Sequence, residues 1–326
     1  MILHDSFGKK IRQNAYIIRA TELGQYINCP RNWMFMSHNG LNLEPRVRPQ
    51  KLRFGIVWHA GLEALYRGKD PFVALTEEFN KEVELILGAA AYEPDIQEAV
   101  EQERQLAATL MQGYLEWRNT EAQPPDNSFS VEDIERRIIV PIGGTHGYLA
   151  ARLDGEVIDN NGGLWILEHK TRGKSSSVDN PPELQLDLQM GLQLYSCAKT
   201  TVHVVRGVLY NLTRKQLPSS RVKAPIYGRH AVTRSKDELQ MIEQTLAVTY
   251  YNMRRDSNLI AKDLNTALTT LRYNPQPNGL CQWGCSVKDI CEAINRKEDV
   301  DYLIDVSLKP RGKTIWETLE EELAEN

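Results

Sequence analysis

Three charged side chains in the middle of the chain have the types and spacing of a metal-binding site. Glu168 and Lys170 alternate within the apolar run 164–170, so in a β-strand both side chains project from one face, about 7 Å apart. Asp154 precedes them, and the Asn-Asn-Gly-Gly turn at residues 160–163 would bring it beside Glu168. Two carboxylates on adjacent strands suit Mg²⁺ or Mn²⁺. A neighbouring lysine can position or deprotonate a water and stabilise the charge that develops when this water attacks phosphorus.

The same spacing also has a non-functional interpretation, because alternating charges are common on solvated strand surfaces. The apolar neighbours of Glu168 favour a central strand, where an unpaired charge is costly. Further upstream, His59 and Glu63 lie one turn apart on one face of a predicted helix. An isolated histidine is more often structural, but beside two carboxylates His59 becomes a candidate third metal ligand.

The cysteines form a second constellation. Cys281, Cys285 and Cys291 follow a C-x3-C-x5-C pattern, and Cys29 stands far upstream in a Cys-Pro-Arg sequence. Three closely spaced cysteines in a chain expected to be cytosolic indicate a metal site rather than disulfides. With Cys29 as the fourth thiolate they could hold tetrahedral Zn²⁺ or a [4Fe-4S] cluster, and unpaired structural thiols remain the alternative. The fifth cysteine, Cys197, is expected as a buried apolar side chain.

The elements that must position these residues follow from hydrophobic periodicity. The N-terminal third predicts helices, and a proline-containing linker follows at residues 123–128. Next come short β-rich runs, which predict three strands in a meander, and then a helix, another strand and C-terminal helices. The expected helices cover residues 21–38, 51–66, 72–86, 96–117 and 182–198, with others from about residue 236, and the expected strands cover 137–142, 147–158, 164–170 and 201–212. The sequence thus predicts a mixed α/β (α+β) protein.

Charge restricts where nucleic acid could bind. The 326 residues carry a net charge of −4 with a pI near 6.0, which excludes a globally basic nucleic-acid coat. Residues 206–236, however, contain eight basic and no acidic side chains, Arg214 and Lys215 among them, and such a segment could contact phosphates or be an ordinary solvated face. Gln189 and Gln193 form a polar stripe on an apolar helix, which could bind a nucleic-acid backbone or cap nearby backbone groups.

Several classes of protein are not indicated. The longest apolar stretch, Leu85 to Tyr92, is eight residues, whereas a membrane span needs roughly 20. The first residues do not resemble a secretory signal, so we expect a cytoplasmic protein. The two Gly-Lys-Ser/Thr triplets, at residues 173–175 and 312–314, lack the glycine of a phosphate-binding loop, so no nucleotide cofactor is expected. The sequence gives no indication of oligomeric state.

Taken together and in this order, the motifs resemble the RecB-like branch of the PD-(D/E)xK nucleases. The resemblance spans residues 29–291 and is strongest to iron-sulfur members: phage-encoded RecB-like exonucleases, CRISPR adaptation nucleases and the nuclease domain of AddB. The motifs that carry it are Cys29-Pro30-Arg31, Gly55-x3-His59-x3-Glu63, Asp154, Glu168-His169-Lys170-Thr171, the glutamine helix and the final three cysteines.

The resemblance implies a restriction-endonuclease-like αβββαβ core with a mixed central sheet. It implies three consecutive regions: an N-terminal helical region (1–125) with the first cluster cysteine and the histidine, a nuclease core (126–236) and C-terminal helices with the cysteine cluster (237–326). It makes His59, Asp154, Glu168 and the main-chain carbonyl of His169 the ligands of Mg²⁺ or Mn²⁺, with Lys170 as the catalytic lysine. Cys29, Cys281, Cys285 and Cys291 would hold a [4Fe-4S] cluster, with Zn²⁺ as the alternative.

The expected function is therefore metal-dependent hydrolysis of DNA, as an exonuclease in phage or CRISPR-related processing. Gln189, Gln193, Arg214 and Lys215 are the expected nucleic-acid contacts. A DNA-binding or scaffold protein that retains the fold and the cysteine cluster without hydrolysis is the alternative.

Overall fold

The computed structural model describes residues 3–13, 15–46, 49–89, 94–173, 178–179, 181–217, 226–271, 281 and 285–324. The chain divides into two compact units, each made of separate segments. Unit 1 contains residues 1–46, 137–151 and 236–326, and unit 2 contains residues 47–136 and 152–235. The expected regions were consecutive along the chain, whereas each unit combines distant segments.

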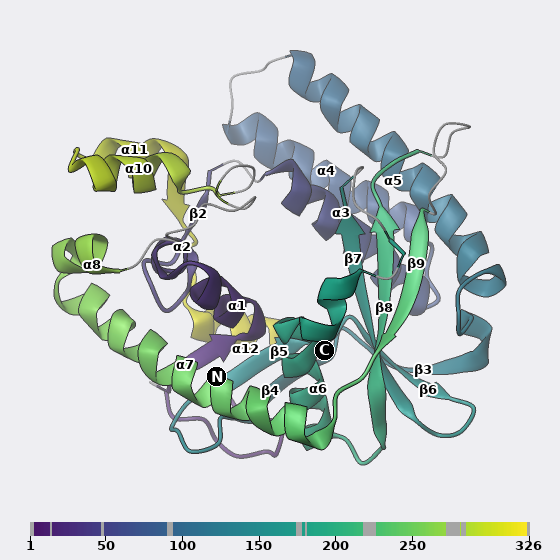
Figure 1. Cartoon of the computed structure of the whole chain (residues 1–326). Coiled ribbons are helices and arrows are strands. Elements are labelled where there is room, and N and C mark those ends of the chain that lie inside the picture. The colour runs from purple at the N-terminus through teal and green to yellow at the C-terminus, as the bar shows by residue number, and fades with distance from the viewer. Residues whose placement is uncertain are drawn as a thin grey trace. The chain divides into compact units, whose positions relative to one another are not determined.

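Unit 2 is built on a five-stranded mixed sheet, whose strands lie side by side at the right of Figure 1. The strands are, in sheet order, β3 (Phe129–Ile134), β6 (Gly155–Asp159), β7 (Leu164–Arg172), β8 (Val205–Arg214) and β9 (Tyr227–Val232). The central pair β7 and β8 is parallel, and the other neighbouring pairs are antiparallel.

Helices cover both faces of this sheet. On one side α3 (Gln50–Tyr66), α4 (Pro71–Ala89) and α5 (Pro94–Thr120) pack together around Trp58 and Tyr114, and α3 contacts β7 (Figure 1). On the face that carries Glu168 lies α6 (Leu188–Thr200), whose N-terminus is capped by the Asp187 carboxylate. Short 3₁₀ turns precede β3 (Asp126–Ser128) and α6 (Pro182–Leu186).

Unit 1 has its own small sheets and a core around Ile17, Ile139 and Ile315. A three-stranded sheet has the order β1 (Ile17–Arg19), β5 (Tyr148–Arg152), β4 (Arg137–Pro141), and β2 (Leu43–Pro45) pairs with β10 (Leu308–Pro310). Helix α1 packs against α7 (Figure 1). The helices are α1 (Ala20–Asn28), α2 (Pro30–Met36), α7 (Lys236–Lys262), α8 (Leu264–Thr270), α10 (Lys288–Arg296), α11 (Asp301–Ser307) and α12 (Ile315–Ala324).

The fold class and the αβββαβ order are confirmed, with β3, β6, β7, α6 and β8 following the helices of unit 2. The predicted meander over 137–170 is wrong, because β4 and β5 belong to the sheet of unit 1. The sequence pattern of residues 147–158 predicts one strand. In the structure the chain bends at Asp154, and the new strand β6 belongs to the five-stranded sheet. The first core strand is β3, whose mostly exposed residues gave no apolar signal.

The predicted helix 21–38 is also divided. Cys29 adopts an extended backbone (φ −159°) because the following residue, Pro30, disfavours helical geometry before it. Pro30 then occupies the first turn of α2, where its missing N–H costs nothing. No helix in the described residues is long and apolar enough to cross a membrane.

Candidate active site

Asp154 and Glu168 meet because of the register between β6 and β7. Gly155 pairs with Leu167, so the residue before β6, Asp154, lies opposite Glu168. The backbone N–H of His169 donates a hydrogen bond to Asp154 Oδ2 at 2.8 Å. The predicted proximity of the two carboxylates is thus present, with Asp154 in the bend that leads into β6 instead of within a strand.

Glu168 lies at the base of the site with 1% of its side chain exposed, and its carboxylate is held by three donors. Lys170, two residues along β7 on the same face, forms an ion pair with Oε1. From α6, Gln189 Nε2 donates to Oε1 at 3.0 Å and Gln193 Nε2 donates to Oε2 at 2.6 Å. These contacts compensate the burial of a carboxylate and fix its orientation.

His59 approaches from α3. Its Nδ1 lies 3.5 Å from Asp154 Oδ1, so an imidazole, two carboxylates and an ammonium converge within unit 2. The side chains of His59 and Lys170 are 25% and 33% exposed, whereas Asp154 and Glu168 are 11% and 1% exposed. Solvent, and any substrate, therefore reaches the site past His59 and Lys170.

The charged groups shift one another's pKa values. Burial disfavours the Lys170 ammonium, but the carboxylates of Glu168 and Asp154 outweigh burial and raise the pKa of Lys170. Asp154 is likewise buried, yet His59 lowers the pKa of its carboxyl group. Burial and the neighbouring Asp154 raise the pKa of Glu168. The His59 pKa is raised, because Asp154 and Glu168 outweigh the effect of burial.

The structure adds one acidic residue that the sequence did not single out. Donor atoms of His59, Glu135 and Asp154 all lie within 4.8 Å of one another. Glu135 follows β3, is 8% exposed and has a left-handed backbone (φ 60°). Burial raises the pKa of Glu135 to about 7. Its position among other acidic residues in Glu-Asp-Ile-Glu carries no distinctive spacing, so only the fold reveals it.

The four residues expected to contact nucleic acid have different surroundings in the structure. Gln189 and Gln193 bind Glu168, and Gln193 is 2% exposed. Arg214 ends β8, and the Lys215 ammonium lies 5.4 Å from the centre of the Phe54 ring.

The rest of the basic segment is not one uniform surface. Arg221 and Lys223 lie outside the described residues. Neither interpretation of the segment, phosphate contact or solvated face, holds at Arg229, whose side chain is fully buried and pairs with Asp126 at 2.6 Å. Arg229 also donates to Asn211 Oδ1, so its charge is used inside unit 2.

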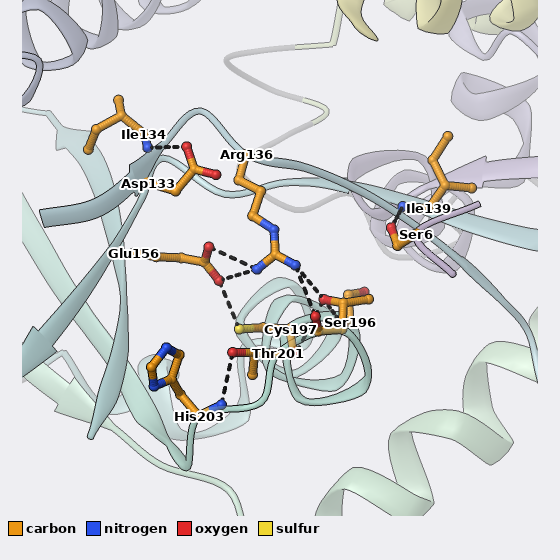
Figure 2. A network of polar contacts seen from close by, with 11 residues as sticks. Ser6, Asp133, Ile134, Arg136, Ile139, Glu156, Ser196, Cys197, Thr201 and His203 are labelled. Carbon is orange, nitrogen blue, oxygen red and sulfur yellow. Dashed lines mark hydrogen bonds and ion pairs between the residues drawn. The ribbon is translucent and has the colours of Figure 1, made fainter. Parts of the chain in front are cut away.

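A buried polar network links the sheet to α6 (Figure 2). Arg136 Nη1 contacts both oxygens of Glu156 on β6 at 2.8 and 2.9 Å (Figure 2). Its Nη2 donates to the carbonyl oxygen of Thr200 at 3.3 Å. Cys197 is buried on α6 as expected, but its thiol contacts Glu156 Oε1 at 3.1 Å (Figure 2), so its surroundings are not purely apolar.

The four other cysteines lie in unit 1 and are free thiols. Cys29 is the N-cap of α2. Amide groups of Asn32 face two sulfurs, with the backbone N–H 3.4 Å from Cys29 Sγ and Nδ2 3.5 Å from Cys285 Sγ. Arg31 Nη1 lies 3.2 Å from Cys291 Sγ. Burial raises the pKa of Cys285, and the thiols of Cys29 and Cys281 add to this shift, which places these sulfurs near one another.

Comparison with known proteins identifies the family. The model of the PD-(D/E)XK nuclease superfamily matches residues 19–292, and the chain belongs to this superfamily. Its members are nucleases that use divalent metal ions, and the site described above contains a suitable set of acidic and imidazole donors. No curated protein matches the chain. A solved structure titled "Crystal structure of SSO0001" is 13% identical to this chain, covering 86% of this chain and 88% of that chain with a TM-score of 0.36.

Proposed function

We propose that this protein hydrolyses phosphodiester bonds of DNA with Mg²⁺ or Mn²⁺ held by His59, Asp154, Glu168 and the main-chain carbonyl of His169. The observation that carries the proposal is the convergence, within unit 2, of an imidazole, two carboxylates and an ammonium. Carboxylate and carbonyl oxygens are the usual protein ligands of Mg²⁺ and Mn²⁺, and the imidazole of His59 adds a softer donor. When bound, such an ion polarises phosphoryl oxygens and lowers the pKa of water.

Lys170 is proposed to act as a cation. Its ammonium forms an ion pair with Glu168 Oε1 at the site. It can therefore orient the attacking water and stabilise the negative charge that develops on the phosphoryl oxygens. Asp154, whose pKa is lowered, stays ionised and accepts from the His169 N–H.

We further propose that the protein belongs to the RecB-like, iron-sulfur branch and acts as an exonuclease in phage or CRISPR-related DNA processing. The support is the ordered set of motifs from Cys29 to Cys291. Arg214 and Lys215, at the end of the central strand β8, are the proposed contacts to the DNA backbone.

For the cysteines we propose a structural [4Fe-4S] cluster. The resemblance to the iron-sulfur branch favours this cluster over tetrahedral Zn²⁺, which four thiolates would also fit. Hydrogen bonds from Asn32 and Arg31 to these sulfurs also suit an iron-sulfur cluster. Iron and sulfide analysis of anaerobically purified protein tests this, and a colourless protein with stoichiometric zinc would overturn it.

The activity is tested with end-labelled linear and covalently closed circular DNA in the presence of Mn²⁺. We expect the wild type to degrade linear DNA and to spare circles, and the Lys170→Ala variant to be slower by at least about 10²-fold, as for loss of a group that stabilises transition-state charge. Because imidazole is a softer ligand than carboxylate, Mn²⁺ should support at least as much activity as Mg²⁺. Binding of DNA without cleavage by both proteins would instead indicate a DNA-binding scaffold, and cleavage of circles would indicate an endonuclease.

A further inference from the structure

Among the described residues, the three donor groups found within 4.8 Å of one another are not the set expected from the sequence. His59 and Asp154 belong to both sets, but the third member in the structure is Glu135, while Glu168 is engaged by Lys170, Gln189 and Gln193. We infer that Glu135 is a further ligand of the divalent cation, binding it together with His59 and Asp154. This inference rests on the proposed metal site and extends it by one residue.

The backbone of Glu135 has an unusual conformation that orients its side chain. Its φ of 60° lies in the left-handed region, which a residue with a Cβ rarely occupies. Such conformations persist where the surroundings impose them, and they concentrate at functional sites. Here the conformation directs a carboxylate of a residue that follows β3 toward side chains from α3 and the β6 bend.

Hydrogen bonds on both sides of Glu135 impose that conformation. Its own N–H donates to the carbonyl oxygen of Asp154 at 3.2 Å, which ties its backbone directly to the metal-site aspartate. On the preceding side, Arg67 Nη2 donates to the carbonyl oxygen of Ile134 at 3.0 Å. On the following side, the N–H of Leu153 donates to the carbonyl oxygen of Arg136 at 2.9 Å.

The side chain of Arg136 anchors the same segment from the opposite direction. It contacts Glu156 (Figure 2) and the carbonyl oxygen of Thr200 at the C-terminal end of α6. Residues 134 to 136 are therefore held by Arg67, which follows α3, by the bend before β6 and by α6. A metal ligand needs such supporting contacts to keep its orientation.

The charges are compatible with this role. Arg152 Nε contacts Glu135 Oε2 at 2.9 Å, and a carboxylate has a second oxygen and further lone pairs for a metal ion. The carboxylates of Glu135, Asp154 and Glu168 lie near one another, with the cations of Lys170 and Arg152 beside them. The donor set of two carboxylates and an imidazole suits Mn²⁺ better than Ca²⁺, which prefers oxygen ligands alone.

The test measures Mn²⁺ affinity directly, by isothermal titration calorimetry and by the electron paramagnetic resonance signal of free Mn²⁺. Glu135→Gln keeps the side-chain volume and removes the charge, and we expect it to weaken Mn²⁺ binding at least about tenfold. Glu132→Gln removes the same charge from an exposed position on β3 and should stay within about twofold of the wild type. Thermal melting of each metal-free protein checks that it is folded, and Glu135→Gly, which suits a left-handed backbone, is the second variant if the glutamine variant fails to fold.

The outcomes separate this inference from the proposed function. Asp154→Asn should also lose Mn²⁺ affinity, because Asp154 belongs to both donor sets. If Asp154→Asn binds weakly while Glu135→Gln and Glu135→Gly bind Mn²⁺ as the wild type does, Glu135 is not a ligand and the proposed nuclease site stands. If Asp154→Asn binds as tightly as the wild type, the proposed metal site and the role of Glu135 are both overturned.

Discussion

At the scale of single residues, the glutamines of α6 contact a carboxylate of the site. Gln193 is 2% exposed and donates to Glu168 Oε2, so it holds a carboxylate of the site in position. Gln189 donates to the other oxygen and is less deeply buried. We therefore propose that Gln193 is a positioning residue for Glu168.

This assignment predicts the kinetics of Gln193→Leu. Loss of the amide donor leaves Glu168 free to rotate, and we expect kcat to fall by about 10- to 100-fold with little change in KM for DNA. Steady-state cleavage of a labelled linear duplex measures both constants. A rise in KM with unchanged kcat would instead show that Gln193 contacts the substrate.

Because of His38 in unit 1, we expect the free energy of unfolding to depend on pH. Burial lowers its pKa to about 4, and the nearby Arg19 and Arg311 add to this shift. Between pH 6.5 and 4 the unfolded chain therefore binds a proton at this residue that the folded chain does not, so the free energy of unfolding falls as pH decreases through this window. With a discount for its partial exposure, the loss is about 1–2 kcal/mol.

His38→Gln removes this contribution. Urea denaturation at several pH values between 4 and 7 should show a shallower loss of stability for the variant than for the wild type. Parallel curves for the two proteins would contradict the assignment, because the remaining carboxylates titrate equally in both.

At the scale of elements, Arg136 connects the segment after β3 to β6 and to the end of α6. Its guanidinium compensates the Glu156 carboxylate, which has only 2% of its side chain exposed, and it also satisfies the carbonyl group of Thr200 at the C-terminus of α6. This bidentate contact holds the sheet and the glutamine-bearing helix together.

Removal of Arg136 alone should be strongly destabilising. Arg136→Ala leaves a buried, uncompensated carboxylate, and we expect a loss of about 3–5 kcal/mol in the free energy of unfolding. The double variant Arg136→Ala/Glu156→Leu should recover most of this loss, because no buried charge remains. Equilibrium denaturation in urea measures both, and equal stability of the single and double variants would contradict the ion pair as the cause.

At the scale of the whole molecule, the two proposed metal groups belong to different units. Unit 2 holds His59, Asp154 and Glu168, and unit 1 holds Cys29 together with the three C-terminal cysteines. Unit 1 thus combines the two ends of the chain, and a cluster at its cysteines would close a loop of about 250 residues.

The substitution Cys285→Ser should therefore reduce the local stability of unit 1. Loss of one cluster ligand is expected to reduce hydrogen-exchange protection in α1, α2 and α10, where the sulfurs and their donors lie. Addition of Mn²⁺ to the wild type should increase protection in α3, β6 and β7. Exchange measured by mass spectrometry checks both, and Cys197→Ser, a change outside the cluster, is the matched control. Equal loss of protection in both variants would contradict a cluster at Cys285.

Local sequence patterns were sufficient to predict several features of the fold and of the candidate site. Alternation along residues 164–170 predicted that Glu168 and Lys170 share a face, helical spacing predicted α3 with His59, and the order of strands and helices predicted the fold class. These features depend on near neighbours in the chain, whose side-chain directions follow directly from backbone geometry.

Tertiary structure alone decided the rest. Glu135 enters the site, Gln193 turns toward Glu168, and Arg229 is buried beside Asp126 because of packing between segments far apart in the sequence. The division of the run 147–158 between two sheets is of the same kind. A periodic pattern specifies which face a side chain occupies, but burial and partner depend on which distant segment covers that face, and this is determined only when the whole chain folds.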